Sequence, residues 1–224
     1  MGKLLAVITV GCDGRSAPAT RTVLAGETLL ARAVRMLVEV APECVVASLP
    51  TASLRGQALA AGVEPLVRPA GADSLEEGVD HALGLVGHGF SHVLAVDPLL
   101  PLRRPGRLAA ALRLAVREGA DCVFSCHRES ALLWQRSPMG LVPYFDPTRR
   151  PGVADGDGVL PWLKEDGGFY LLSVAAFRRD GHRHAGRIAP LEIEPEEAVM
   201  ADSPSGLAVC RALLAEPAGQ TAGA

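Results

Sequence analysis

The stretch Ser91–Arg103, SHVLAVDPLLPLR, contains an apolar run that stops at the carboxylate of Asp97. Residues 92–96 lie between Gly89 and Pro98 and are rich in β-branched and aliphatic residues, which predicts a strand buried on both faces of a parallel sheet. Because ligands of open α/β sheets bind beyond the carboxyl ends of the strands, Asp97 would stand at the mouth of a site. At this position Asp97 either holds a metal ion or caps the turn before Pro98.

On both sides of this stretch, apolar runs alternate with segments of helical periodicity. Such alternation predicts an α/β fold with right-handed crossovers and a doubly wound, mainly parallel sheet. The predicted strands cover residues 4–10, 44–47, 63–67, 92–96, 121–125, 168–172 and 188–193. The predicted helices cover residues 27–40, 51–61, 73–86, 105–119, 174–179 and 204–214.

Helix boundaries are marked by capping residues. Thr51 is the predicted N-cap of the second helix, and Asp73 with Glu76 has the spacing of a capping box at the head of the third. Ser203 followed by Pro204 is a strong helix start. Asp202 is therefore expected immediately before the N-terminus of the last helix.

The alternation breaks between residues 130 and 164, where both tryptophans of the chain occur among turn residues. We expect irregular strands that leave the main sheet and form either a dimerisation arm or a lid over the same subunit. Residues 1–216 are expected to form one domain. Residues 217–224, PAGQTAGA, are expected to form a disordered tail.

The composition excludes several classes of function. With 49% hydrophobic and 4% aromatic residues, the 224-residue chain can bury one largely aliphatic core. Its net charge of −3 offers no general field for nucleic acid or an anionic membrane, so neither is an expected partner. The sequence shows no long apolar run and no signal-peptide pattern, and its five cysteines fall mostly in apolar segments. A cytoplasmic, reduced protein is expected.

A glycine-containing loop, Gly11–Ser16, follows the first predicted strand. Its small residues would let backbone N–H groups approach an anion, with Arg15 adding charge, although on its own the loop is more ordinarily a polar turn. Arg68 and Arg103 also follow predicted strands and would lie on the same edge as Asp97. Several arginines on one edge favour an anionic ligand.

Other polar clusters suggest less. Cys122 and Cys126 lack a second cysteine pair and are interpreted as core residues rather than zinc ligands. The segment His182–His184 is interpreted as a solvated surface turn. Ser125, Cys126 and His127 are adjacent in sequence, which does not make a catalytic triad.

Four motifs resemble those of the acylneuraminate cytidylyltransferases and, more distantly, of the 3-deoxy-manno-octulosonate cytidylyltransferases. The resemblance covers residues 4–214. VITVGCDGRSAPATR (7–21) is similar to I-P-A-R-x-G-S-K-x-x-P-x-K-N, and VDPLLPLR (96–103) to L-Q-P-T-S-P-L-R. KEDGGFYLL (164–172) is similar to E-N-G-A-I-Y-I, and V-x-x-D (199–202) to V-D-I-D.

The resemblance implies a nucleotide site and an acceptor site. The nucleotide site would comprise Gly11, Cys12, Asp13, Gly14, Arg15, Arg21, Arg68 and Ser74. The acceptor site would comprise Asp97, Arg103, Glu165 and Asp166. The family's Gln-Thr-Ser set is replaced here by Asp97, Leu99 and Leu100, which favours a related but altered acceptor.

The resemblance also implies a magnesium ion. The first aspartate of the family's closing motif is Met200 in this chain, and the second is kept as Asp202. The octulosonate relatives carry an aspartate in the turn that holds Asp97, so Asp97 and Asp202 are the expected Mg²⁺ ligands and, with Arg15, the expected catalytic residues. The expected activity is transfer of CMP from CTP to a hydroxyl of a sugar acid or related acceptor by a homodimer. The alternative is a catalytically impaired descendant that binds nucleotide or serves in assembly.

Overall fold

The computed structural model describes residues 2–149 and 162–215. The predicted tail 217–224 and part of the predicted arm fall outside these residues. The strands are β1 (Lys3–Thr9), β2 (Val23–Leu24), β3 (Glu27–Thr28), β4 (Cys44–Leu49), β5 (Glu64–Val67), β6 (Phe90–Val96), β7 (Cys122–Glu129), β8 (Trp134–Ser137), β9 (Gly140–Pro143), β10 (Trp162–Ser173) and β11 (Ile188–Glu192). The α-helices are α1 (Leu29–Met36), α2 (Arg55–Ala60), α3 (Leu75–Val86), α4 (Arg107–Glu118), α5 (Val174–Asp180) and α6 (Pro204–Ala215).

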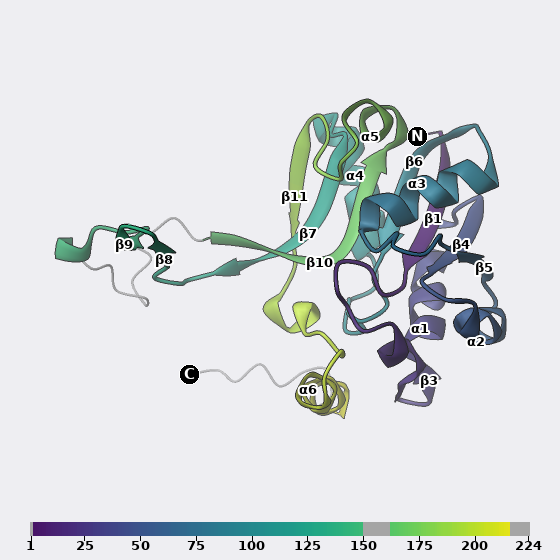
Figure 1. The fold of residues 1–224 in the computed structure, drawn as a ribbon, viewed down its shortest axis with the longest axis horizontal. Helices are drawn as coiled ribbons and strands as arrows, with labels where there is room; N and C mark the ends of the chain where they lie inside the picture. Colours follow the sequence, from purple (N-terminus) through teal and green to yellow (C-terminus); the bar gives the residue numbers. More distant parts are fainter. Residues whose placement is uncertain (1, 150–161, 216–224) are drawn as a thin grey trace.

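Seven strands form the main sheet in the order β11-β7-β10-β6-β1-β4-β5 (Figure 1). All neighbouring pairs are parallel except those of β10, which runs antiparallel to both β6 and β7. The predicted mainly parallel, doubly wound α/β fold is confirmed. Because β10 is reversed, its first residues lie at the carboxyl edge of the parallel strands, where Phe169 is the partner of Val96.

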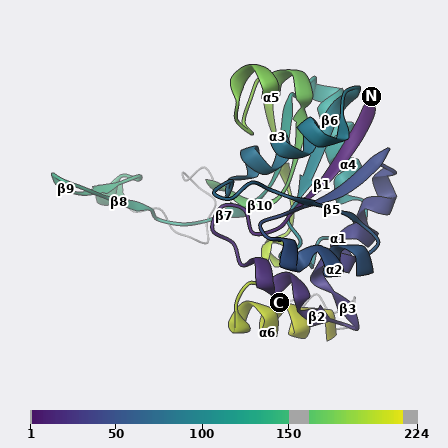
Figure 2. The same ribbon diagram turned by 45° about the vertical axis from the view of Figure 1, so that its right-hand side comes forward.

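Two apolar layers cover the sheet. Residues of α1, α2 and α4 pack on one face, and residues of α3 and α5 pack on the other. A smaller cluster joins α6 to the hairpin β2–β3 and to Leu99 below the carboxyl edge (Figure 2). This cluster fixes the segment that ends at Asp202. In the described part of the chain, no helix is long and apolar enough to cross a membrane.

Several predicted boundaries are wrong for local reasons. The helix expected from residue 27 begins at Leu29, because Glu27 and Thr28 pair with β2 and Thr28 caps the helix. Thr51 makes no capping bond; its hydroxyl contacts Ser53, and α2 begins only at Arg55 after a 3₁₀ turn. The helix expected from Pro105 begins at Arg107, because Gly106 adopts a left-handed conformation.

The third helix is also capped differently from the prediction. Ser74, not Asp73, is its N-cap, and Glu77, not Glu76, completes the capping box. The Ser74 hydroxyl accepts from the N–H of Glu77, whose carboxylate accepts from the N–H of Ser74. This one-residue shift frees Glu76 to face a different partner. At the last helix, Ser203 accepts from the N–H of Gly206 at 3.2 Å, so the predicted helix start is confirmed.

The predicted excursion after β7 is present as a separate hairpin, β8–β9, which projects away from the body of the molecule in both views (Figures 1 and 2). Its large apolar side chains are exposed: Trp134, Met139, Leu141, Val142 and Tyr144. The excursion is shorter than expected, because residues 162–164 belong to β10 and pair with the end of β7.

Candidate active site at the carboxyl edge of the sheet

Arg15 is the centre of the polar cluster at this edge. Its Nε lies 3.2 Å from Oδ2 of Asp97, and its Nη2 donates to the carbonyl oxygen of Asp166 at 2.9 Å. Its Nη1 lies 3.5 Å from the sulfur of Met200. One guanidinium therefore joins the glycine loop, the end of β6, the start of β10 and the segment before α6. These are the four segments that carry the sequence motifs.

Asp97 is buried and has partners for both carboxylate oxygens. Besides the contact with Arg15, Oδ1 accepts from the N–H of Leu99 at 2.8 Å, so Asp97 does cap its turn. Burial raises the pKa of Asp97 to about 6, although the positive charge of Arg15 opposes the shift. Ionisation of Asp97 at neutral pH thus costs free energy, and a neighbouring cation is needed to stabilise the carboxylate.

This raised pKa gives a first prediction, for the protein without ligands. A carboxyl group whose pKa is higher in the folded chain than its ordinary 3.8 contributes stability below that value and loses it as the pH rises to about 6. The free energy of unfolding of Asp97→Asn, relative to the parent protein, should therefore rise by about 2–3 kcal/mol between about pH 4 and pH 7.5, since one pKa unit corresponds to ~1.4 kcal/mol. Urea denaturation at the two pH values measures it. A difference that stays constant with pH would contradict the prediction.

Asp202 follows a segment that is bonded to the turn after Asp97. Its neighbour Ala201 donates to the carbonyl oxygen of Leu99 at 2.8 Å, which holds the segment before α6 against the turn after Asp97. Asp202 itself is exposed. Within residues 2–149 and 162–215, no group of three or more His, Cys, Asp or Glu side chains could hold a metal ion. A metal ion at this edge would need oxygen ligands from a substrate as well.

Asp166 enters the site through a bulge in β10. The pairing of β10 with β7 is interrupted between Glu165 and Tyr170, and the hydroxyl of Ser125 fills the gap. This hydroxyl donates to Oδ1 of Asp166 at 2.6 Å and accepts from the N–H of Phe169 at 3.2 Å. Oδ2 of Asp166 is buried without a hydrogen-bond partner. The bulge turns the backbone of Asp166 towards Arg15.

Two predicted ligand-binding arginines serve the fold. Arg68 is buried and donates to the carbonyl oxygens of Ala72, Ser48 and Val10 at 2.8, 2.8 and 3.0 Å, tying the ends of three strands together. Arg103 is buried over the ring of Phe169 and donates to the carbonyl oxygen of Gly168 at 2.7 Å. Contact of either side chain with a ligand stays a prediction.

The other predicted nucleotide-binding residues are spread more widely. Gly11, Asp13 and Gly14 all have positive φ angles, which gives the loop its tight shape. Cys12 is buried, and burial raises the pKa of its thiol to about 11, so the thiol is neutral. Ser74 caps α3, and Arg21 lines a separate hollow of about 400 Å³ beside Gln57. The structure therefore brings Arg15, Asp97 and the backbone of Asp166 together, and places Arg21 elsewhere.

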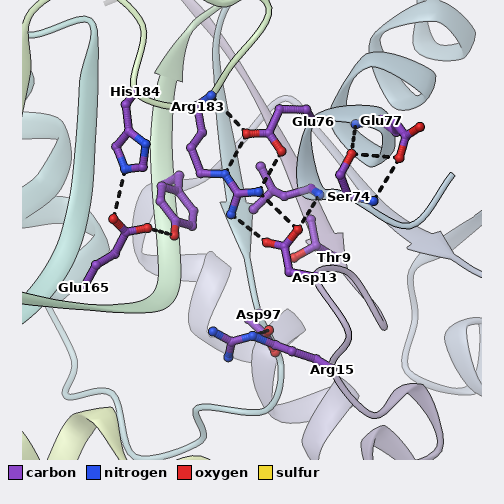
Figure 3. A network of polar contacts seen from close by, with 12 residues as sticks. Thr9, Asp13, Arg15, Ser74, Glu76, Glu77, Asp97, Glu165, Arg183 and His184 are labelled. Carbon is purple, nitrogen blue, oxygen red and sulfur yellow. Dashed lines mark hydrogen bonds and ion pairs between the residues drawn. The ribbon is translucent and has the colours of Figure 1, made fainter. Parts of the chain in front are cut away.

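The segment His182–His184 is a turn with an exposed His182, as the sequence predicts, but Arg183 is not solvated. The guanidinium of Arg183 contacts Asp13 at 2.6 Å and Glu76 at 2.6 Å, and lies over the ring of Tyr170 (Figure 3). His184 contacts the carboxylate of Glu165 at 3.0 Å. A local pattern of alternating His and Arg could not have revealed these partners, because they lie on three distant segments of the chain.

Comparisons with known proteins find similar structures but no similar sequences. No family model and no curated protein sequence matches the chain. A solved 4-diphosphocytidyl-2C-methyl-D-erythritol synthase from Anaerococcus prevotii has a similar structure, with a TM-score of 0.68, 10% identity and 96% of each chain covered. A CMP:2-keto-3-deoxy-manno-octonic acid synthetase complexed with CTP has a TM-score of 0.64 and 13% identity, with 95% of this chain and 98% of that chain covered. Nearly the whole chain thus shares the α/β fold of these two proteins.

Proposed function

We propose that this protein is a nucleotidyltransferase that transfers CMP from CTP to a hydroxyl of a sugar acid or related small acceptor and releases pyrophosphate. The observation that carries the proposal is the convergence on Arg15 of Asp97, the backbone of Asp166 and Met200. Of the two similar structures named above, one is a synthase of a diphosphocytidyl compound, and the other is a synthetase of a CMP-linked sugar acid that was solved with CTP. The motif resemblance to acylneuraminate cytidylyltransferases supports the acidic character of the acceptor.

The chemistry of phosphoryl transfer is mainly positioning and charge neutralisation. The left-handed residues of Gly11–Arg15 form a tight loop, in which the N–H groups of Asp13 and Arg15 are bonded to carbonyl oxygens of the fold. Arg15 supplies a guanidinium that can donate two hydrogen bonds to phosphate oxygens. Arg15 would exchange its contact with Asp97 for the phosphates. This exchange would leave the carboxylate of Asp97 free to bind a cation.

We propose that Asp97 and Asp202 hold a magnesium ion together with phosphate oxygens. Both carboxylates are hard oxygen donors, and Mg²⁺ is commonly held by one or two carboxylates together with phosphate oxygens and water. The proposal is supported by the bond between Ala201 and Leu99, which joins the segments that carry them. When bound, the ion would neutralise charge that develops on the phosphates. Asp97 would orient it from the end of β6, and Asp202 from the start of α6.

A second candidate function is nucleotide binding or assembly without catalysis. It is favoured by the engagement of both oxygens of Asp97, one with Arg15 and one with the N–H of Leu99. The presence of Met200 at the position of a family aspartate also supports it. In this case Arg15 would act as a permanent counter-ion to Asp97.

A substrate panel tests the proposed function. Pyrophosphate release is measured with CTP, GTP, UTP and ATP, each with Mg²⁺ and candidate sugar acids, alongside thermal shifts with and without Mg²⁺. CTP-dependent release supports the enzyme, whereas a thermal shift without release supports the binding protein. No release and no thermal shift with any nucleotide would reject both nucleotide-based functions.

A further prediction concerns Arg15. Arg15→Ala should weaken CTP binding by about 1.5–3 kcal/mol, the range for charge-assisted hydrogen bonds. The melting temperature of the protein without ligand should also fall at neutral pH, because the side chain of Arg15 is only 19% exposed and its loss leaves the buried carboxylate of Asp97 without this cation. Isothermal titration calorimetry measures the affinity, and Arg128→Gln, which removes an exposed arginine paired with Glu192, is the control. An unchanged affinity would mean that Arg15 serves only Asp97.

The hairpin β8–β9 leads to a prediction about assembly. We propose that it packs on a second copy of the chain, because it carries Trp134 and other exposed apolar side chains and projects from the body (Figure 1). Light scattering at micromolar concentration should give the mass of a dimer, and Trp134→Ser with Leu141→Ser should shift it towards the monomer. A monomeric mass of the parent protein would instead favour a lid.

A further inference from the structure

Arg183 forms the most extensively bonded ion-pair cluster near the proposed site. Its Nη1 and Nη2 lie 2.6 and 3.2 Å from the two carboxylate oxygens of Asp13. Its Nε and Nη2 lie 2.7 and 2.6 Å from the two oxygens of Glu76, and its backbone N–H adds a bond of 3.2 Å to the same carboxylate. The side chain of Arg183 is only 15% exposed. Figure 3 shows its guanidinium facing the carboxylates of Glu76 and Asp13.

We propose that Arg183 is a positioning residue that fixes the Gly11–Arg15 loop through Asp13 and thereby sets the affinity for the nucleoside triphosphate. This inference rests on the proposed function. Arg183 would not touch the reacting atoms. Its effect would pass through the conformation of the loop.

The first step of the argument is the conformation of Asp13. Its φ angle is +55°, in the left-handed region, which Asp adopts more readily than most non-glycine residues. Its N–H donates to the carbonyl oxygen of Asp73 at 2.8 Å, and its Oδ1 accepts from the N–H of Leu75 at 3.2 Å. The loop is thus bonded to the first turn of α3, and Arg183 completes this contact from the other side.

The second step is the charge balance. Asp13 and Glu76 both face the guanidinium of Arg183, and without it the two carboxylates would lie together with no shared cation. Burial opposes ionisation of Glu76, yet hydrogen bonds from Arg183 lower the pKa of this carboxyl to about 2. The N-terminus of α3 stabilises negative charge at the same place. Loss of Arg183 would therefore leave two carboxylates that repel each other, with only the N-terminus of α3 and the bonds to Asp73 and Leu75 to hold Asp13 in place.

The third step is the distance along the chain to Arg15. Only Gly14 separates Asp13 from Arg15, and the N–H of Arg15 donates to the carbonyl oxygen of Cys12 at 3.0 Å. Any shift of Asp13 changes the direction in which Arg15 leaves the loop. A phosphate site of backbone N–H groups and one guanidinium tolerates little misplacement. The affinity for nucleotide should therefore follow the Asp13–Arg183 contact.

The experiment compares Arg183→Gln, Arg183→Lys and Asp13→Asn with the control Arg128→Gln. Hydrogen exchange of the amides of residues 11–16 is followed without nucleotide, and the dissociation constant of CTP is measured by calorimetry. Arg183→Gln should accelerate exchange and raise the dissociation constant at least about tenfold, the loss of a charge-assisted contact. At saturating CTP, kcat should stay within about threefold of the parent value. Arg183→Lys should be intermediate, since an ammonium cannot span both carboxylates.

The outcomes separate this inference from the proposed function. If the parent protein binds no CTP, the proposed function fails, and accelerated exchange still decides whether Arg183 positions the loop. If Arg183→Gln lowers only the melting temperature, and amide exchange of the loop and CTP affinity are unchanged, the contacts of Arg183 with Asp13 and Glu76 contribute only to stability. The inference is then overturned. Should Arg183→Gln not fold, Asp13→Asn decides in the same way, because it leaves the contact between Arg183 and Glu76 in place.

Discussion

Asp97→Asn is expected to reduce magnesium-dependent CMP transfer about 100-fold or more. Asparagine keeps the oxygen that accepts from the N–H of Leu99, so the turn survives, but it removes the negative charge that would hold the cation. A loss of this size corresponds to about 2.7 kcal/mol of transition-state stabilisation. The rate of pyrophosphate release, measured over a range of Mg²⁺ concentrations, tests it.

The matched control is Asp180→Asn, which changes an aspartate at the exposed end of α5 that pairs with Arg179. It should leave turnover unchanged. Undiminished magnesium-dependent turnover of Asp97→Asn would show that this carboxylate holds no catalytic cation. The Arg15–Asp97 pair would then be a structural contact, and binding without catalysis would become the better account of the fold.

Gly206→Val is expected to lower the free energy of unfolding by ~3 kcal/mol, the upper end of the usual cost of overpacking. Gly206 lies in the first turn of α6, and a β-carbon there would overlap the carbonyl oxygen of Met200. That oxygen belongs to the backbone, so the segment Met200–Asp202 must move. The variant should therefore also weaken the response to Mg²⁺ and CTP.

Gly84→Val is the control, because Gly84 lies within α3 and a β-carbon there would meet open space. Urea denaturation compares the two variants with the parent protein. Equal stability of the two variants would contradict the close packing of α6 against Met200. A destabilised Gly206→Val that keeps the parent's response to Mg²⁺ would separate the packing of α6 from the placement of Asp202.

The sequence predicts the main sheet well because each parallel strand is a short apolar run between turn residues. It does not predict the direction of β10, since an apolar run such as Phe169–Leu172 has the same pattern in either direction. It also misplaces the cap of α3 by one residue. Asp73 and Ser74 are each followed by Glu three positions later, so either could be the N-cap. The choice depends on Asp13, whose N–H donates to the carbonyl oxygen of Asp73.

For the candidate site, the sequence predicts that the residues lie at the carboxyl edge of the sheet, but it does not predict which side chains contact each other. Residues after consecutive parallel strands must meet at one edge, so Arg15 and Asp97 could be expected near each other. That they contact each other depends on side-chain directions, which no residue spacing contains. The sequence does not reveal the role of Arg183, because its partners Asp13 and Glu76 are far away in sequence. Their contacts with Arg183 are known only from the structure.

The reversed strand β10 also constrains how the protein can fold while it is being made. β6 and β7 are synthesised well before β10, yet each has β10 as its neighbour in the sheet. Until residues 162–173 leave the ribosome, β6 keeps one unpaired edge, and β7 has neither of its neighbours, because β11 is made after β10. Open edges pair readily with other chains. In a nascent or truncated chain that ends in the hairpin β8–β9, the open edges of β6 and β7 are therefore exposed, and aggregation competes with folding until β10 is inserted between them.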